Sequence, residues 1–262
     1  MGHIIAIANQ KGGVGKTTTA INLGAALALN GRKVLLIDMD AQANCSKGLG
    51  IILSKEDFGI HSVLSGLCKI NDIICQTPVE NLLIAPSHID LSAVEQELTG
   101  EVGGFRSLSA AIKDVMTQFD YIIVDTPPSL GMLSINSIVA SDSILITVEP
   151  EPYALDGMDA LRQLIDKIRT RLEHPVEVMG VLITRYQQGT KVHTTLHNEL
   201  KNYWGNKVFS TCIRKNVDVS AAALESLPVV TTMPKSMAGE DYMTLAREVE
   251  ERGSKKDAGT GK

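Results

Sequence analysis

Residues 11–18, Lys-Gly-Gly-Val-Gly-Lys-Thr-Thr, have the residue types and spacing needed to bind the phosphates of a nucleotide. The three glycines let the backbone bend so that successive N–H groups converge on phosphate oxygens, and the positive end of a following helix would add to them. Lys16 is spaced to reach the β- and γ-phosphates, and the Thr17 hydroxyl to bind Mg²⁺. A glycine-rich stretch is often only a turn, but here the glycines, lysine and hydroxyl are in register. The segment predicts a phosphate-binding loop formed by Lys11, Gly12, Gly13, Val14, Gly15, Lys16, Thr17 and Thr18.

The loop departs from the ordinary phosphate-binding pattern at one position and carries an additional lysine. That pattern places its first glycine where this chain has Gln10, and it does not require a lysine at position 11. Lys11 could be a solvated surface residue beside a turn. Its place directly before the glycines favours a role at the phosphates instead.

Two apolar runs end in carboxylates that could hold a metal ion near this loop. Residues 34–37 are followed by Asp38 and Asp40, and residues two apart on a strand share one face, so both can point toward the phosphates. Residues 121–124 are followed by Asp125, which resembles a Walker-B carboxylate beside Mg²⁺. An aspartate shortly before proline is often only a turn residue. The upstream loop favours the functional interpretation, because phosphoryl transfer needs a positioned metal ion.

These residues require a scaffold that brings strand ends together, and the apolar pattern predicts one. We expect strands at 4–8, 33–38, 82–85, 121–125, 143–148 and 178–184, several of them nearly continuous in Ile, Val and Leu, as in parallel sheets buried on both faces. Helices are expected at 17–30, 91–98, 108–118, 155–172, 192–204 and 237–251. This alternation predicts an α/β fold, a doubly wound, mostly parallel sheet with helices on both faces. Ligands of such sheets bind at the carboxyl ends of the strands, where the loop and the aspartates fall.

Length and composition indicate one ordinary globular domain. The chain has 262 residues, of which 44% are apolar and 21% charged. We expect a single domain over residues 1–251 and a disordered tail over 252–262, with no amphipathic helix for a membrane surface. The four cysteines form no C-x-x-C pair, which argues against a disulfide framework or a zinc site built from them. With no signal peptide and no long apolar segment, we expect a cytoplasmic protein.

Charge is unevenly distributed along the chain. The net charge of −5 argues against a blanket nucleic-acid binder. From Arg185 to the end, however, 12 Lys and Arg residues face 9 Asp and Glu residues, whereas the preceding part has 13 against 21. The last third could carry a local basic face or simply a solvated, mixed surface.

The motifs together resemble those of a known family. The segments Lys-Gly-Gly-Val-Gly-Lys-Thr-Thr, Leu-Leu-Ile-Asp-Met-Asp-Ala-Gln and Ile-Ile-Val-Asp-Thr-Pro-Pro-Ser are similar to those of the ParA/Soj branch of the deviant Walker A P-loop NTPases, which are relatives of MinD. Residues 131–136, 149–157 and 214–216 extend the resemblance, which covers about residues 1–250.

The resemblance implies a role for each residue of the site. Lys11 would be the signature lysine that reaches the nucleotide of the partner subunit in an ATP-dependent homodimer. Lys16 and Thr17 would act on the nucleotide of their own subunit, and Asp40 would orient the attacking water. Asp38 and Asp125 would belong to the Mg²⁺ shell, and the adenine side of the site would include Thr184 and Arg185. A lysine donated in trans would act as an arginine finger does, stabilising transition-state charge only once two subunits meet. Because neither Asp38 nor Asp40 has an obvious strong base beside it, slow intrinsic hydrolysis is expected.

The resemblance further implies an ATP-gated cycle on DNA. The ATP dimer would bind double-stranded DNA non-specifically, and a ParB-like or analogous partner would stimulate hydrolysis and release, placing the protein on the nucleoid. The candidate DNA-binding residues are Arg185, Lys191, Arg214, Lys215 and Lys235. Two departures weaken this expectation: Asp218 stands where the family commonly has arginine, and the stretch 185–189, Arg-Tyr-Gln-Gln-Gly, lacks the arginine expected next to Gly189.

Other functions of related proteins remain as alternatives. A ParA-like ATPase could position a protein cargo instead of a plasmid or chromosome origin. A membrane-cycling ATPase like MinD would need an amphipathic C-terminal helix. An iron–sulfur carrier or nitrogenase-type reductase would need suitably spaced cysteines, and a tyrosine kinase of this superfamily would need a C-terminal tyrosine cluster. The sequence shows none of these three features.

Overall fold

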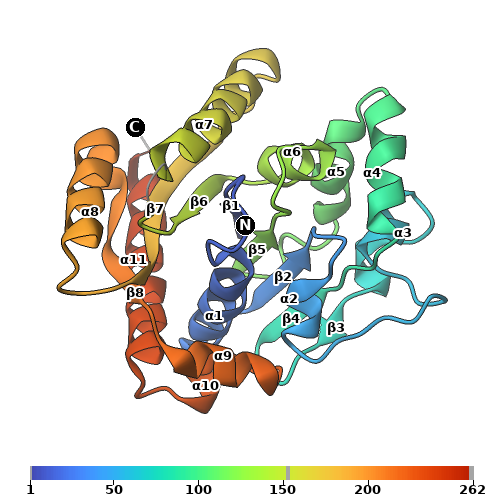
Figure 1. Ribbon diagram of the computed structural model, residues 1–262. Helices are drawn as coiled ribbons and strands as arrows, with labels where there is room; N and C mark the ends of the chain where they lie inside the picture. The colour runs from blue at the N-terminus through green and yellow to red at the C-terminus, as the bar shows by residue number, and fades with distance from the viewer. Residues whose placement is uncertain (1, 152–153, 260–262) are drawn as a thin grey trace.

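The computed structural model describes residues 2–151 and 154–259, which build one eight-stranded sheet between helices (Figure 1). The strands lie in the order β3-β4-β2-β5-β1-β6-β7-β8. All neighbours are parallel except β3 and β4, which are antiparallel at the sheet edge. The strands are β1 (His3–Ala8), β2 (Val34–Asp38), β3 (Cys75–Gln76), β4 (Leu82–Ala85), β5 (Tyr121–Asp125), β6 (Ser143–Val148), β7 (Glu177–Tyr186) and β8 (Val208–Arg214).

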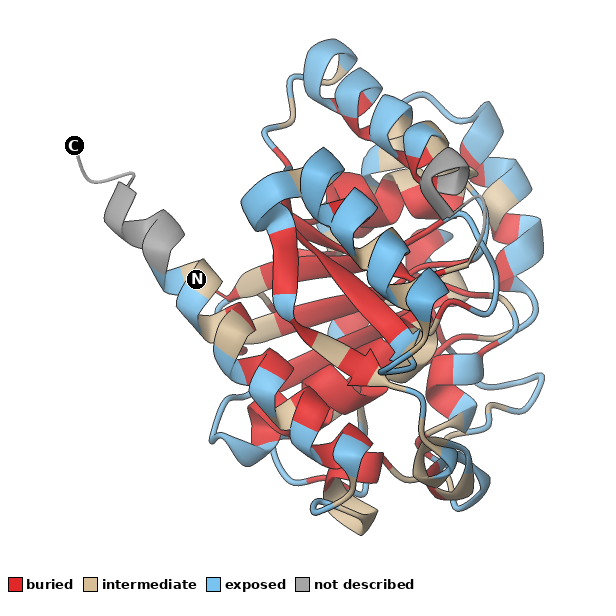
Figure 2. Cartoon of the chain, turned by 60° about the vertical axis from the view of Figure 1, so that its left-hand side comes forward, coloured by how far each residue is buried: buried red, intermediate tan, exposed pale blue. Residues whose placement is uncertain are grey.

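Helices cover both faces of this sheet, and Figure 2 shows its buried strands running between exposed outer helices. The longer helices are α1 (Lys16–Leu29), α4 (Leu91–Gly100), α6 (Met132–Val139), α7 (Ala154–Arg171), α8 (Lys191–Trp204), α9 (Val217–Leu224) and α11 (Met237–Gly259). The shorter ones are α2 (Asn44–Lys47), α3 (Ile60–Leu64), α5 (Ser107–Ile112) and α10 (Val229–Thr232). Within the described ranges, no helix combines the length and apolarity that a membrane crossing demands.

Alternating side chains of the central strands pack into opposite layers. On β1, Ile5 and Ile7 join residues of α1, α10 and α11, whereas Ile4 packs with α3, α4 and α5, and Ala8 with α7. Both sets are buried, which explains why the strands are apolar at nearly every position. Each fully buried Ile or Leu contributes about 1.5–3 kcal/mol of transfer free energy. The sheet is therefore a rigid platform for the loops at its carboxyl edge.

The predicted fold class is confirmed, and each of the six predicted strands overlaps an observed one. The observed strands include two more, β3 and β8, at opposite edges of the sheet. Helices α2, α3, α6, α9 and α10 were likewise not predicted. Edge strands and short helices lack the long apolar periodicity on which the prediction depends.

The C-terminal tail does not begin at residue 252, because α11 continues to Gly259. The Arg252 guanidinium donates hydrogen bonds to the carbonyl oxygens of Met179, Lys207 and Val208, at 2.9, 3.1 and 3.0 Å. It also lies over the Phe209 ring, 4.0 Å from the centroid. These contacts fasten α11 at Arg252 to β7 and β8, a tertiary effect that composition does not reveal. Residues 260–262 lie outside the described residues.

Candidate functional site

The phosphate-binding loop joins the carboxyl end of β1 to the first turn of α1 in the middle of the sheet. Gly13 and Gly15 have positive φ angles of 77° and 81°, a conformation that favours glycine. Gly15 is the N-cap of α1, and a Cβ there would lie 3.5 Å from the Thr184 methyl group. The intervening Val14 is buried, whereas Gly12 and Gly13 are exposed. The glycines therefore set a loop whose backbone is open to a ligand.

Lys16 is the first residue of α1, and its side chain folds back against the loop formed by the preceding residues. Its side chain is buried, and its ammonium donates a hydrogen bond of 3.1 Å to the carbonyl oxygen of Lys11. Burial lowers the pKa of Lys16, and the nearby carboxylates of Asp125 and Asp40 oppose that shift. A buried ammonium near two carboxylates is well suited to receive phosphate oxygens.

Lys11 lies at the surface of the same loop. Its backbone N–H donates to the side-chain oxygen of Asn9 at 3.0 Å, and its ammonium forms an ion pair with Glu151. Both side chains of this pair are 46% exposed. The Lys11 ammonium lowers the pKa of Glu151 through a hydrogen bond and through its charge. The two lysines of the loop thus occupy different environments.

The predicted carboxylates meet at the carboxyl edge of the sheet. Asp38 of β2 and Asp125 of β5 are register partners, and Asp40 follows β2 directly. Asp38 accepts hydrogen bonds from the backbone N–H and hydroxyl of Ser46, at 2.9 and 2.7 Å. Burial nevertheless raises the pKa of Asp38 to about 6. Asp40 is also buried and accepts a hydrogen bond from the Gln42 backbone N–H.

Asp125 has the surroundings expected of a cation ligand. The residue is 1% exposed, and neither carboxylate oxygen has a hydrogen-bond partner among the described residues. Burial, together with the charge of Asp38, raises its pKa well above the usual value, and the nearby Thr17 hydroxyl and Lys16 ammonium only partly oppose this shift. Leaving a carboxylate buried without partners is costly, and a bound divalent cation would remove that cost. Thr17, Asp38 and Asp125 therefore fit a Mg²⁺ ion, since their oxygens are the ligands it prefers.

Thr184 and Arg185 lie in the last residues of β7 beside the loop, where a cavity of about 610 Å³ opens. The Thr184 hydroxyl lies 2.9 Å from the carbonyl oxygen of Val14 and 3.2 Å from that of Val148, so it fastens the loop to the sheet. Arg185 pairs with Glu149 at 3.3 Å. The cavity is lined by Gly13, Gly15, Thr18, Thr184, Arg185, Ile213, Arg214, Lys215, Asn216, Val217, Val219, Ser220 and Tyr242. Its place beside the phosphate loop suits the base and ribose of a nucleotide.

The candidate DNA-binding residues differ in how free their charges are. Arg214 is occupied, since its guanidinium donates to both carboxylate oxygens of Asp241 and lies 3.8 Å from Glu240. Arg185 is paired as described above. The three lysines among the candidates, Lys191, Lys215 and Lys235, are exposed and form no ion pair with the described part of the chain.

Asp218 has a structural explanation. It lies in the first turn of α9, which Asn216 caps by accepting a hydrogen bond from the Asp218 backbone N–H. A carboxylate is favoured there by the positive end of the helix.

Sequence reasoning missed the residues that hold the predicted ones in place. Ser46 restrains Asp38, while Glu149 and Glu151 hold Arg185 and Lys11. The glutamates were available only as part of a motif resemblance. Ser46 carries no motif signal, because its importance depends on where α2 returns to the sheet.

A family model described as an AAA domain matches residues 2–178. The chain is 42% identical to the sporulation initiation inhibitor protein Soj of Bacillus subtilis, over 97% of this chain and 100% of that protein. It is 38% identical to the chromosome-partitioning ATPase Soj of Treponema pallidum, over 95% of this chain and 97% of that one.

A solved structure with this fold has a nucleotide and a metal ion bound. It is cobyrinic acid a,c-diamide synthase from Mycobacterium smegmatis with an ATP analog and magnesium, with a TM-score of 0.83 and 28% identity over 94% of this chain and 93% of that chain. Because the Soj proteins are more similar to this chain and match it from end to end, they define its family. The chain belongs to the ParA/Soj family of AAA-domain ATPases.

Proposed function

We propose that this ATPase is a dimerising switch that partitions or positions DNA, such as a plasmid or chromosome origin, through ATP-gated, non-specific DNA binding. The observation that carries the proposal is the different placement of the two loop lysines. Lys16 is buried against the loop backbone, whereas the Lys11 ammonium is at the surface and paired with Glu151. This difference supports a division in which Lys16 acts on its own nucleotide and Lys11 on that of a second copy.

Hydrolysis would then depend on residues from two subunits. Lys16 binds the β- and γ-phosphates, and Asp40 orients the attacking water. Lys11 of a second copy compensates the charge that develops on the leaving oxygens. Mg²⁺, held by Thr17, Asp38 and Asp125, would neutralise charge on the phosphate oxygens when bound. The magnesium and ATP analog in the synthase of the same fold support these two ligands.

DNA binding in this proposal relies on lysines. Lys191, Lys215 and Lys235 are exposed and free of ion pairs within the described residues, whereas Arg185 and Arg214 are paired. Lysine contacts with phosphates would give sequence-independent, salt-dependent binding on the nucleoid. A ParB-like or analogous activator would end the bound state by stimulating hydrolysis. The partition ATPase among the relatives supports DNA as the cargo.

Transport of a protein cargo is the second candidate. The intramolecular pairing of Arg214 and the acidic Asp218 both reduce the positive charge available for DNA near α9. With weaker DNA binding, the same ATP cycle could position a protein assembly. Binding of random-sequence duplex with ATP, compared with ADP, separates the two functions.

A mixing experiment tests the division between the lysines. Lys11→Gln lacks the lysine proposed to act in trans, and Asp40→Ala lacks the residue proposed to act in cis. Neither variant should hydrolyse ATP alone. In a mixed dimer, the Lys11→Gln subunit keeps its own Asp40 and receives Lys11 from its partner, so part of the wild-type turnover should return.

The same mixture shows when the proposal is wrong. If Lys11 acts on its own nucleotide, no site in a mixed dimer has both residues and turnover stays at background. A mixture of Lys11→Gln with Lys11→Ala is the matched control, because no subunit in it supplies the lysine. Activity in that control would mean that Lys11 is dispensable.

A further inference from the structure

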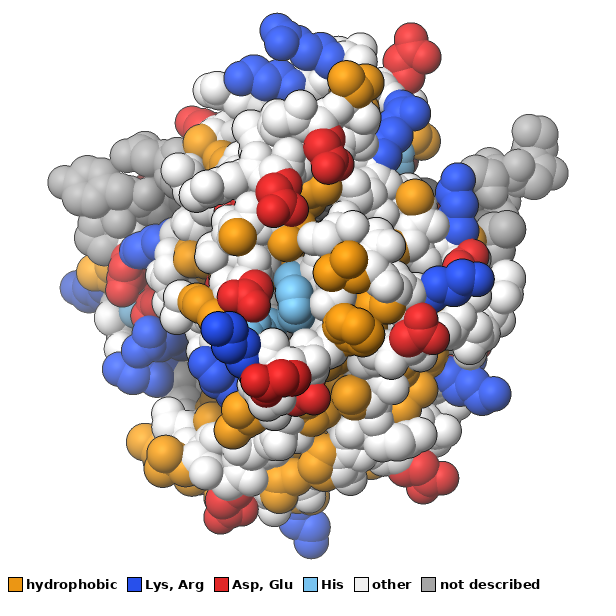
Figure 3. Space-filling view, turned by 90° about the vertical axis from the view of Figure 1, so that its right-hand side faces the viewer, with side chains coloured by type: hydrophobic (Ala, Val, Ile, Leu, Met, Phe, Trp, Pro, Cys, Tyr) orange, Lys and Arg blue, Asp and Glu red, His pale blue; other side chains and the backbone are white. Residues whose placement is uncertain are grey.

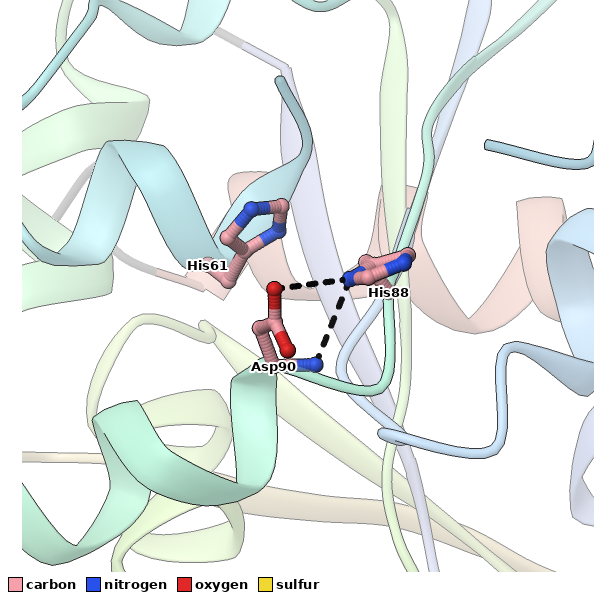
Figure 4. A group of neighbouring side chains, drawn as sticks. All are labelled: His61, His88 and Asp90. Carbon is pink, nitrogen blue, oxygen red and sulfur yellow. Dashed lines mark hydrogen bonds and ion pairs between the residues drawn. The ribbon is translucent and has the colours of Figure 1, made fainter. Parts of the chain in front are cut away.

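Two histidines and an aspartate meet on the side of the sheet that carries α3 and α4. His61 belongs to α3, while His88 and Asp90 lie in the turn between β4 and α4. Figure 4 shows the three side chains grouped together, with His88 linked to both the carboxylate and the backbone nitrogen of Asp90. One potential ligand atom from each residue lies within 4.8 Å of the others. In the described ranges, no other group of three His, Cys, Asp or Glu residues meets this spacing.

One ring nitrogen of His61 lacks a hydrogen bond within the described part of the chain. The Nδ1 atom of His61 is buried and has no hydrogen-bond partner among the described residues, while its Nε2 atom lies 3.0 Å from the Ser62 hydroxyl. Leaving a buried ring nitrogen without a partner costs free energy. A ligand that accepts a lone pair would use this atom, and Ser62 would then hold the ring orientation through Nε2.

No protonation state of His88 satisfies both of its contacts with Asp90. The Nδ1 atom of His88 lies 3.3 Å from the Asp90 backbone N–H nitrogen and 3.2 Å from the Asp90 carboxylate. A protonated Nδ1 satisfies the carboxylate but faces another donor, and a deprotonated Nδ1 satisfies the N–H but faces a negative oxygen. A cation beside the carboxylate relieves the second arrangement.

We propose that His61, His88 and Asp90 form a binding site for a divalent first-row transition ion of the Zn²⁺ type. Imidazole nitrogens with one carboxylate suit such ions, whereas Mg²⁺ and Ca²⁺ prefer sites built from oxygens. Three protein ligands leave a further position for water. None of these residues belongs to the phosphate loop or to its carboxylates, so the proposal is independent of the proposed function.

The three side chains can close around an ion with small movements. Metal–ligand bonds of about 2.0–2.2 Å require the three donors to approach one another more closely than they do now. The Asp90 side chain is 53% exposed and can rotate toward the rings. Figure 3 shows histidine atoms at the surface near the middle of this face.

Binding would brace two segments that now share few polar contacts. The Ile60 backbone N–H donates to the carbonyl oxygen of Pro86 at 2.9 Å, directly beside the cluster. The ion would add a second link between α3 and the turn. It would therefore stabilise the folded protein to an extent set by its concentration relative to its dissociation constant.

The test is a titration of the metal-stripped, full-length protein with Zn²⁺, with excess Mg²⁺ present throughout. Calorimetry should give one Zn²⁺ per chain, Zn²⁺ should raise the melting temperature, and Co²⁺ should produce visible absorption bands. His61→Gln and His88→Gln should each weaken Zn²⁺ binding by about tenfold or more, because loss even of residues that only support ligands costs 10–100-fold. Asp90→Asn, at an exposed position, should weaken binding without disturbing the fold.

His193 and His197 on α8 provide the matched control. They are spaced four residues apart on one helix and lie near Tyr186, but no third ligand of the required spacing joins them among the described residues. The double variant His193→Gln, His197→Gln should keep wild-type affinity. The proposal is overturned if the wild-type chain binds no Zn²⁺, or if Asp90→Asn and His88→Gln bind it as tightly as wild type. It is also overturned if only the α8 variant loses binding.

Discussion

Lys11 and Glu151, 140 residues apart in the chain, form an ion pair at the mouth of the phosphate-binding loop. Both side chains are about half exposed, and a surface pair of this kind contributes only about 0–1 kcal/mol to folding. The pair therefore positions Lys11 but holds it only weakly. A phosphate bound to another subunit could replace Glu151 as its partner at a small cost in free energy. In each subunit, Lys11 would stay paired with Glu151 until a dimer forms.

Lys11 and Lys16 should respond differently to the same substitution. Lys11→Gln should retain ATP binding and lower turnover by about 100-fold or more, because it removes charge compensation in the transition state. Lys16→Gln should weaken ATP binding by roughly tenfold or more, because it removes a buried, charge-assisted interaction with phosphate. Calorimetric nucleotide binding and phosphate-release assays check both. Equal loss of binding in the two variants would contradict the different roles.

Asp40→Ala should trap an ATP-bound dimer. The substitution removes the residue proposed to orient water but leaves Lys11, Lys16 and the proposed cation ligands in place. Size-exclusion chromatography with light scattering in ATP and Mg²⁺ should show a persistent dimer. Asp114→Ala, at an exposed position on the surface, is the control and should behave as wild type. Monomers of Asp40→Ala under these conditions would argue against this role.

Charge reversal should separate DNA-binding lysines from structural pairs. Lys215→Glu and Lys235→Glu should weaken ATP-dependent binding to random duplex and lower the salt slope by about 0.9 for each phosphate that the protein no longer neutralises. Lys113→Glu, an exposed lysine outside the C-terminal third, should have no such effect. Arg214→Ala should mainly reduce stability, because it leaves Asp241 without its partner. Unchanged DNA affinity in both lysine variants would favour a protein cargo.

Glu248 should make stability depend on acid pH. Burial raises the pKa of this carboxyl. Hydrogen bonds from Ser210, Thr211 and Arg252 lower the pKa by more than burial raises it, so the net shift is downward. Because the pKa of Glu248 is lower in the folded state, its charge stabilises the fold at any pH above its unfolded-state pKa. This contribution is lost as the pH falls through the folded-state pKa.

Denaturation of Glu248→Gln checks this dependence. The variant should be less stable than wild type at pH 7, and the difference should shrink as the pH falls below about 4.5, the usual range for glutamate. Glu251→Gln, at a neighbouring exposed position, should change neither stability nor its pH profile. A pH-independent difference would mean that packing rather than charge makes Glu248 important.

Much of the site could be predicted from sequence because its motifs are local. Glycines that permit positive φ, a lysine and a hydroxyl in fixed spacing define the loop wherever it occurs, as Gly13 and Gly15 illustrate. The alternation of apolar runs with helical patterns similarly determined the parallel sheet, since strands buried on both faces must be apolar throughout. Asp38 and Asp125 were placed together because both end such strands.

Other features depended on contacts between distant segments. β8 has a mixed sequence and forms a strand through pairing with β7 and packing against α11. α11 extends beyond residue 251, where its end was expected, and Arg252 there donates to the carbonyl oxygens of Met179 in β7, of Lys207 just before β8 and of Val208 at the start of β8. Neither effect leaves a periodic signal in the local sequence.

The sequence by itself determined which residues could bind phosphate and at which edge of the sheet they would lie. Only the tertiary structure decided which of their charges are available. Glu151 forms an ion pair with Lys11, and Asp241 forms one with Arg214, whereas Asp125 has no hydrogen-bond partner among the described residues. The reason is physical: backbone conformation follows from neighbours in the chain, whereas the state of a charge depends on whatever the fold brings within a few ångströms of it.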